Sequence, residues 1–78
     1  METTLDSLQL RETCTVTSIN AQKSLRRKIL DMGITPGTKI LLKNIAPLGD
    51  PIEITLRGYN LSIRKSEAKN VFVKKEEK

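Results

Sequence analysis

Two stretches rich in glycine and proline constrain the fold more than any other feature of this sequence. Residues 30–40 read LDMGITPGTKI, and residues 45–54 read IAPLGDPIEI. Glycine reaches positive φ at no steric cost, while proline fixes φ and cannot continue a helix. The chain must therefore turn sharply at two defined places, and short elements joined by tight corners are expected.

The first corner follows a predicted helix over roughly residues 21–32, for which Asn20 is the expected N-cap. Leu25, Ile29 and Met32 fall on one face at the spacing i, i+4, i+7, which is typical of a half-buried helix. We expect the helix to end at a glycine with positive φ, and a proline–glycine turn to lead into a strand. These turn residues are Gly33, Pro36 and Gly37.

Alternating apolar and β-branched residues predict a series of short strands. The expected strands are 12–19, 39–45, 52–57, 59–64 and 70–73, with a polar corner at 65–69. Gly58 breaks the run between the third and fourth of them. Short strands separated by turns indicate a small antiparallel barrel. We expect one domain over residues 1–78, with frayed ends at 1–7 and 74–78.

The second corner, APLGDP, carries an apolar residue at its centre, where a plain turn would have a polar one. Pro47 and Pro51 stiffen its two ends, and Gly49 with Asp50 supplies the bend. Leu48 has two interpretations at this point. Either it folds back over an open end of the barrel, or a rigid loop presents it to a partner at low entropic cost.

Composition argues against catalysis by this chain. It has no histidine, the commonest general base and metal ligand, and its glycines match no phosphate-binding loop. The one cysteine, Cys14, is predicted to be a small core residue, and its lack of a partner points to a reducing compartment. We expect no catalytic residues, no metal ligands and no cofactor. The chain shows no charged signal peptide and no apolar run of about 20 residues, so we expect a cytoplasmic protein.

The charge balance invites an anionic partner. The net charge is +5, from 14 basic and 9 acidic residues. The predicted helix has a basic edge, Arg26, Arg27 and Lys28, suited to an acidic protein or an anionic lipid surface. Nucleic acid is the poorer candidate, because single strands are bound on aromatic platforms and the only aromatic residues are Tyr59 and Phe72. A protein-interaction module is expected, with a nucleic-acid-binding or free-standing regulatory barrel as the alternative.

Several motifs follow one another in a distinctive order. Residues 25–73 contain an Arg-rich helix and then DMGITPG, APLGDP, RGYNLSIR and SEA. This order closely resembles the ferrous iron transport protein A family. The resemblance implies an SH3-like barrel of about five strands, with one α-helix between the first two main strands. It associates the chain with the transport of a transition metal but assigns it no metal ligand.

The resemblance also implies a role. The family consists of small bacterial cytosolic proteins that accompany a large membrane ferrous iron transporter with a guanine-nucleotide-binding domain. The expected function is non-catalytic regulation of iron uptake, by contact with the cytosolic side of that transporter and hence peripheral to the membrane. We expect the contact at Pro47-Leu48-Gly49 or at the basic edge Arg26-Arg27-Lys28. A third interpretation has an arginine of the barrel aid GTP hydrolysis in the complex.

Overall fold

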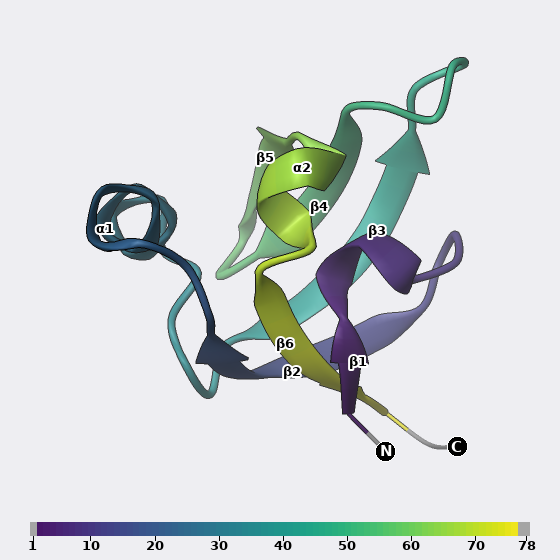
Figure 1. The fold of residues 1–78 in the computed structure, drawn as a ribbon. Coiled ribbons are helices and arrows are strands. Elements are labelled where there is room, and N and C mark those ends of the chain that lie inside the picture. Colours follow the sequence, from purple (N-terminus) through teal and green to yellow (C-terminus); the bar gives the residue numbers. More distant parts are fainter. Residues whose placement is uncertain (1, 77–78) are drawn as a thin grey trace.

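The computed structural model describes residues 2–76, whose strands form one antiparallel sheet curled around a single apolar core (Figure 1). The strands are β1 (Glu2–Thr4), β2 (Thr13–Ile19), β3 (Lys39–Ile45), β4 (Ile52–Leu56), β5 (Tyr59–Ile63) and β6 (Val71–Lys75), and their order in the sheet is β1-β6-β2-β3-β4-β5. The helical elements are the 3-10 turn η1 (Leu5–Ser7), α1 (Lys23–Asp31) and α2 (Lys65–Ala68). None of the helices within residues 2–76 has the length and apolar character needed to cross a membrane.

The N-terminal segment differs most from the sequence-based expectation. Residues 2–4 form β1, which pairs with β6 in the register Glu2↔Lys74, Thr3↔Val73 and Thr4↔Phe72. The prediction of a frayed start was wrong because Leu5 and Leu8, at 0% and 5% exposed, enter the core and hold this segment in place. Lys74 and Lys75 likewise belong to β6, whereas residues 77–78 lie outside the described residues.

The helix between the first two main strands is confirmed, but it begins later than predicted. Its N-cap is Gln22, with no side-chain capping bond, rather than Asn20. The reason is that the backbone of Asn20 is still hydrogen-bonded next to β6: its N–H donates to the carbonyl of Asn70 at 2.8 Å. Ile29 is fully buried, while Leu25 and Met32 pack against the core from its margin, as the predicted helix face requires.

The expected polar corner at 65–69 contains a turn of helix, α2. Its start is supported by Glu67, whose carboxylate accepts a long hydrogen bond of 3.4 Å from the Arg64 N–H. Ala68, the last residue of α2, is fully buried in the core. In Figure 1 this short helix lies in front of β4 and β5, between α1 and the loop that joins β3 to β4.

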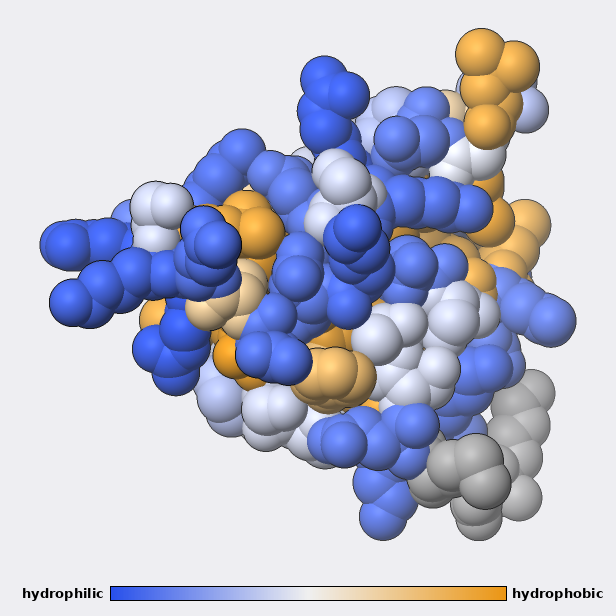
Figure 2. Space-filling model, in the orientation of Figure 1, coloured by the Kyte–Doolittle hydropathy of each residue, from blue (hydrophilic) through white to orange (hydrophobic). Residues whose placement is uncertain are grey.

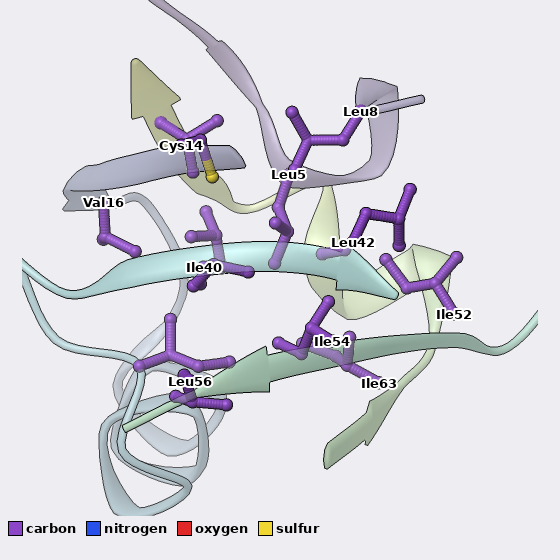
Figure 3. Packing of buried hydrophobic residues seen from close by; sticks show 14 of the residues in the cluster. Leu5, Leu8, Cys14, Val16, Ile40, Leu42, Ile52, Ile54, Leu56 and Ile63 are labelled. Carbon is purple, nitrogen blue, oxygen red and sulfur yellow. The ribbon is translucent and has the colours of Figure 1, made fainter. Parts of the chain in front are cut away.

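Every strand from β2 to β6 sends alternate side chains into one core (Figure 3). The pairing of β3 with β4 is irregular between Leu42 and Asn44. An extra residue in a strand reverses the faces of the residues beyond it. As a result Ile45, which strict alternation places on the outer face, packs against the core instead. The buried apolar residues are Leu5, Leu8, Cys14, Val16, Ile29, Ile34, Ile40, Leu42, Ile52, Ile54, Leu56, Ile63, Ala68, Val71 and Val73.

Candidate partner-binding surfaces

The loop between β3 and β4 projects from the barrel and carries an almost fully exposed leucine at its tip. Leu48 is 97% exposed, so it does not fold back over the end of the barrel. Apolar atoms stand out at the tip of this loop in Figure 2, at the upper right. Two backbone hydrogen bonds close the loop: the Gly49 N–H donates to Ala46 at 2.7 Å, and the Ala46 N–H donates to Pro51 at 3.1 Å. The loop therefore has a defined shape.

A further contact ties this loop to α2. The Asp50 carboxylate accepts a hydrogen bond of 2.9 Å from the N–H of Lys65, the first residue of α2. The ammonium group of Lys65 lies beside the loop, since a Cβ built on Gly49 would be 3.7 Å from Lys65 Nζ. The apolar tip is thus held by the body of the protein and has a cation next to it.

The basic edge of α1 is exposed, but its three residues are not equivalent. Lys28 Nζ lies 2.6 Å from Glu67 Oε2, an ion pair that joins α1 to α2. Arg26 and Arg27 are exposed and make no salt bridge with any other residue of the described range. Two of the three predicted contact residues therefore have guanidinium groups available to a partner, and the third has a structural role.

The Lys28–Glu67 pair predicts a pH dependence of stability. The hydrogen bond from Lys28 is the main cause that lowers the pKa of the Glu67 carboxyl below its usual value of 4.5. A lowered folded-state pKa adds stability that is present above the unfolded-state value and is lost as the pH falls through the folded-state value. We expect Glu67→Gln to lose this contribution, which is below about 1 kcal/mol because Lys28 is largely exposed.

The measurement is the free energy of unfolding in urea at neutral pH and at acidic pH for both proteins. The difference in free energy of unfolding between wild type and Glu67→Gln should become smaller as the pH is lowered below the usual pKa of a carboxyl group. Lys39→Met serves as a control, because the Lys39–Glu76 pair is longer, at 3.7 Å, and more exposed. A difference that stays constant across this range would contradict the assignment.

The glycine and proline turns hold the corners of the fold. Gly33, at φ +94°, ends α1, and the Ile34 N–H returns to the carbonyl of Ile29 at 3.3 Å. In the Pro36-Gly37 turn the Thr38 N–H donates to Thr35 at 3.0 Å. Pro51 closes the β3–β4 loop, and Gly58 completes the two-residue turn between β4 and β5.

One structural side chain in the β4–β5 turn gave no signal in the sequence. Arg57 has a positive φ of 49°, which is unusual for a residue other than glycine. Its guanidinium group donates to Thr35 Oγ1 at 3.0 Å and to Thr38 Oγ1 at 3.1 Å. The hydroxyl of Tyr59, in the next strand, donates to the Met32 carbonyl at 2.6 Å, and the side chain is 43% exposed. Arg57 thus links the β4–β5 hairpin to the turn between α1 and β3, and Tyr59 links it to the C-terminal end of α1.

Cys14 is fully buried, in agreement with its predicted role as a core residue. Burial is the largest cause that raises the pKa of its thiol to about 12, and the nearby carboxylates of Glu76 and Glu12 act in the same direction. The thiol is therefore protonated and inaccessible at neutral pH. We expect a disulfide reagent to label the native protein at least about 100-fold more slowly than the denatured chain, because labelling requires opening of the core. Rapid stoichiometric labelling of the native protein would contradict this.

Two shallow clefts, and the carboxylate and thiol groups of residues 2–76, are candidate sites for a small ligand or a metal ion. No group of three His, Cys, Asp or Glu side chains gathers to hold a metal ion within residues 2–76. A cleft of about 210 Å³ lies at the base of the β3–β4 loop, and one of about 230 Å³ lies over β3 and β4. Both are smaller than a typical ligand pocket. Sequence reasoning missed Leu10, which is 52% exposed in the loop before β2; its only signal was an apolar residue in a polar stretch.

Comparison with known proteins finds a matching family and several similar structures. The model of a family described as the FeoA domain matches residues 3–75. The structure resembles that of an FeoA-like protein from Clostridium acetobutylicum, with 43% identity, a TM-score of 0.92, and coverage of 99% of this chain and 90% of that one. It also resembles Stenotrophomonas maltophilia FeoA complexed with zinc, described as a prokaryotic SH3 domain protein, with 27% identity, a TM-score of 0.78, and coverage of 90% and 87%. The predicted SH3-like architecture is confirmed, with six strands instead of about five.

A curated relative links this domain to a transporter in a single chain. It is the Fe(2+) transport protein A/Fe(2+) transporter FeoB fusion protein of Porphyromonas gingivalis. The identity is 29% over 69 residues, which cover 88% of this chain. They cover 8% of the fusion protein, so this chain corresponds to a small part of that relative.

Proposed function

This chain belongs to the FeoA domain family, and from that membership we propose that it is a non-catalytic accessory protein of ferrous iron uptake that binds the cytosolic region of a membrane ferrous iron transporter. The family is linked to ferrous iron transport. The fusion relative supports the choice of partner, because in that protein the domain and the transporter are parts of one chain.

The observation that carries this proposal is the exposed Leu48 on a loop of fixed shape. An apolar side chain that is 97% exposed gains free energy when a partner covers it, about 2 kcal/mol for a leucine, or roughly 30-fold in affinity. The hydrogen bonds across the loop and the Asp50–Lys65 contact reduce the ordering cost of binding. We therefore place the principal contact at Pro47-Leu48-Gly49.

The basic edge of α1 is the second proposed contact, reduced here to Arg26 and Arg27. It lies on the side of the molecule away from the β3–β4 loop, with α2 between them (Figure 1). Long-range attraction of these cations to an acidic partner surface would raise the association rate and make it dependent on salt. The two regions therefore make separable contributions, one apolar and one electrostatic.

The test is the affinity of the labelled protein for the whole transporter solubilised in detergent. We expect Leu48→Asp to weaken binding at least about tenfold without loss of the fold, since the side chain touches almost nothing in the free protein. Ser18→Asp, which places the same charge on an exposed position of β2, serves as the control. Equal affinities for Leu48→Asp and wild type would rule out the loop as the contact.

The electrostatic contact has its own test in the same assay. Arg27→Glu should weaken binding and flatten its dependence on salt concentration, whereas Lys74→Glu, an equal charge change on β6, should have a much smaller effect. If both substitutions act alike, binding responds to net charge alone and the edge of α1 is not a specific contact.

A further inference from the structure

A second exposed leucine lies at the same end of the barrel as Leu48. Among residues 2–76 the large apolar side chains that are exposed are Leu10, Leu48 and Tyr59. The hydroxyl of Tyr59 is held by the end of α1, so it serves the fold. Leu10 is 52% exposed and belongs to the loop between η1 and β2. Its side chain has no polar group that could serve the fold in the way the Tyr59 hydroxyl does.

The backbone places this loop beside the middle of β3, on the side where β2 begins and β3 continues toward the β3–β4 loop. The Arg11 N–H donates to the carbonyl of Leu42 at 2.8 Å, and the Leu42 N–H donates to the carbonyl of Glu12 at 3.0 Å. Three residues of strand separate Leu42 from Ile45, or about 10 Å, and the β3–β4 loop begins immediately afterwards. Both loops lie on the right-hand side in Figure 1, and apolar atoms recur along the same side in Figure 2.

The charge available at this end is positive. Arg11, Lys43 and Lys65 are exposed, and none of them forms a salt bridge with another residue in the described range. Of the neighbouring carboxylates, Glu53 lines the cleft at the base of the β3–β4 loop without an ion pair in the described range, and the other two are engaged within the protein. Glu12 lies 3.3 Å from Lys75 Nζ and accepts the Gln9 N–H, and Asp50 accepts the Lys65 N–H.

We propose that Leu10 and Leu48 act as two anchors of one docking surface, the leucine end of the barrel. Its partner is an apolar patch with carboxylates at its border, which pair with Arg11, Lys43 and Lys65. This inference rests on the proposed function, since it assigns the patch to the cytosolic region of the transporter. A standard interface covers roughly 800 Å² on each partner, about 30 Å across, which is comparable to the principal extents of the whole molecule, 31 × 28 × 23 Å, and is therefore wide enough to include both loops.

The two-anchor surface is tested with Leu10→Asp, Leu48→Asp and the double variant, in the same assay with the solubilised transporter. We expect each single substitution to weaken binding at least about tenfold, and the double variant to lose at least about 100-fold, because separate anchors in one bound state contribute almost additively. The ¹H–¹⁵N spectrum of each variant should remain that of the folded protein.

The outcomes separate this inference from the proposed function. A loss with Leu48→Asp and none with Leu10→Asp would overturn the two-anchor surface but leave the proposed contact intact. No loss with either, while the transporter still binds and Arg27→Glu still weakens it, would overturn both apolar anchors but not the partnership. Failure of the wild-type protein to bind the transporter at all would overturn the proposed function itself.

The chemistry of the partner is tested separately. Lys43→Glu should weaken transporter binding more than Lys74→Glu, which lies on β6. Vesicles of phosphatidylethanolamine and phosphatidylglycerol should retain the wild-type protein and Leu48→Asp equally poorly. Strong retention on these vesicles that Leu10→Asp and Leu48→Asp abolish would overturn the proposal, because it would show that the leucine end faces lipid.

Discussion

Replacement of Gly33 by alanine is expected to lower the free energy of unfolding by about 2 to 3 kcal/mol, a large share of the stability of a small domain. Two costs combine at this position. The backbone has φ +94°, which an alanine adopts only under strain. In addition, a Cβ here would overlap the hydroxyl oxygen of Tyr59, so the half-exposed ring must shift and give up its hydrogen bond to the Met32 carbonyl, at a cost of about 1 kcal/mol.

Gly37→Ala is a matched control for this prediction. Gly37 has nearly the same φ, +92°, but a Cβ there meets no atom within 4 Å. It should therefore incur only the backbone cost, about 1 to 2 kcal/mol. Adding Tyr59→Phe to Gly33→Ala removes the overlapping oxygen and should recover part of the loss, as urea unfolding of the four proteins would show. Equal destabilisation by the two glycine substitutions would contradict the packing account.

The second large effect is expected at Leu5, in the segment whose structure the sequence did not reveal. Leu5 is fully buried, and its truncation to alanine should cost about 3 kcal/mol through lost burial and the cavity left behind. Leu10→Ala, at a half-exposed position five residues later, should cost less than about 1 kcal/mol. Urea unfolding monitored by circular dichroism measures both. A loss below 1 kcal/mol for Leu5→Ala would mean that β1 and η1 are not part of the cooperative fold.

The corners of the fold could be predicted because their chemistry is local. A glycine after the last apolar position of a helix, and a proline–glycine pair before a strand, leave the backbone few alternatives. In the structure Gly33 and Gly37 both have positive φ, and backbone hydrogen bonds close both turns. The alternation of Ile52, Ile54 and Leu56 identified β4 for a similar reason. The three residues of β1 show no such period, and their pairing depends on Leu5 reaching the core together with a strand some 70 residues away.

The candidate site was predictable in part. Leu48 was recognisable in the sequence as an apolar residue among turn formers. Its exposure to solvent, however, depends on the hydrogen bonds that close the β3–β4 loop. The pairing of Lys28 with Glu67 joins residues 39 apart in the chain and leaves no local pattern. Leu10 was missed because its position beside β3 follows from the pairing of Arg11 with Leu42, which are 31 residues apart in the chain.

The most direct test of the central claim is the ¹H–¹⁵N spectrum of the labelled protein during titration with the solubilised transporter, with GDP and then with a GTP analogue. We predict that the amide signals of residues 46, 48–50 and 9–11 broaden or shift first, followed by those of 26–27. Nucleotide dependence of these changes would identify a regulator of the transporter. A spectrum unchanged at every ratio and with both nucleotides would contradict the account, because it would show that the leucine end of the barrel does not bind the transporter.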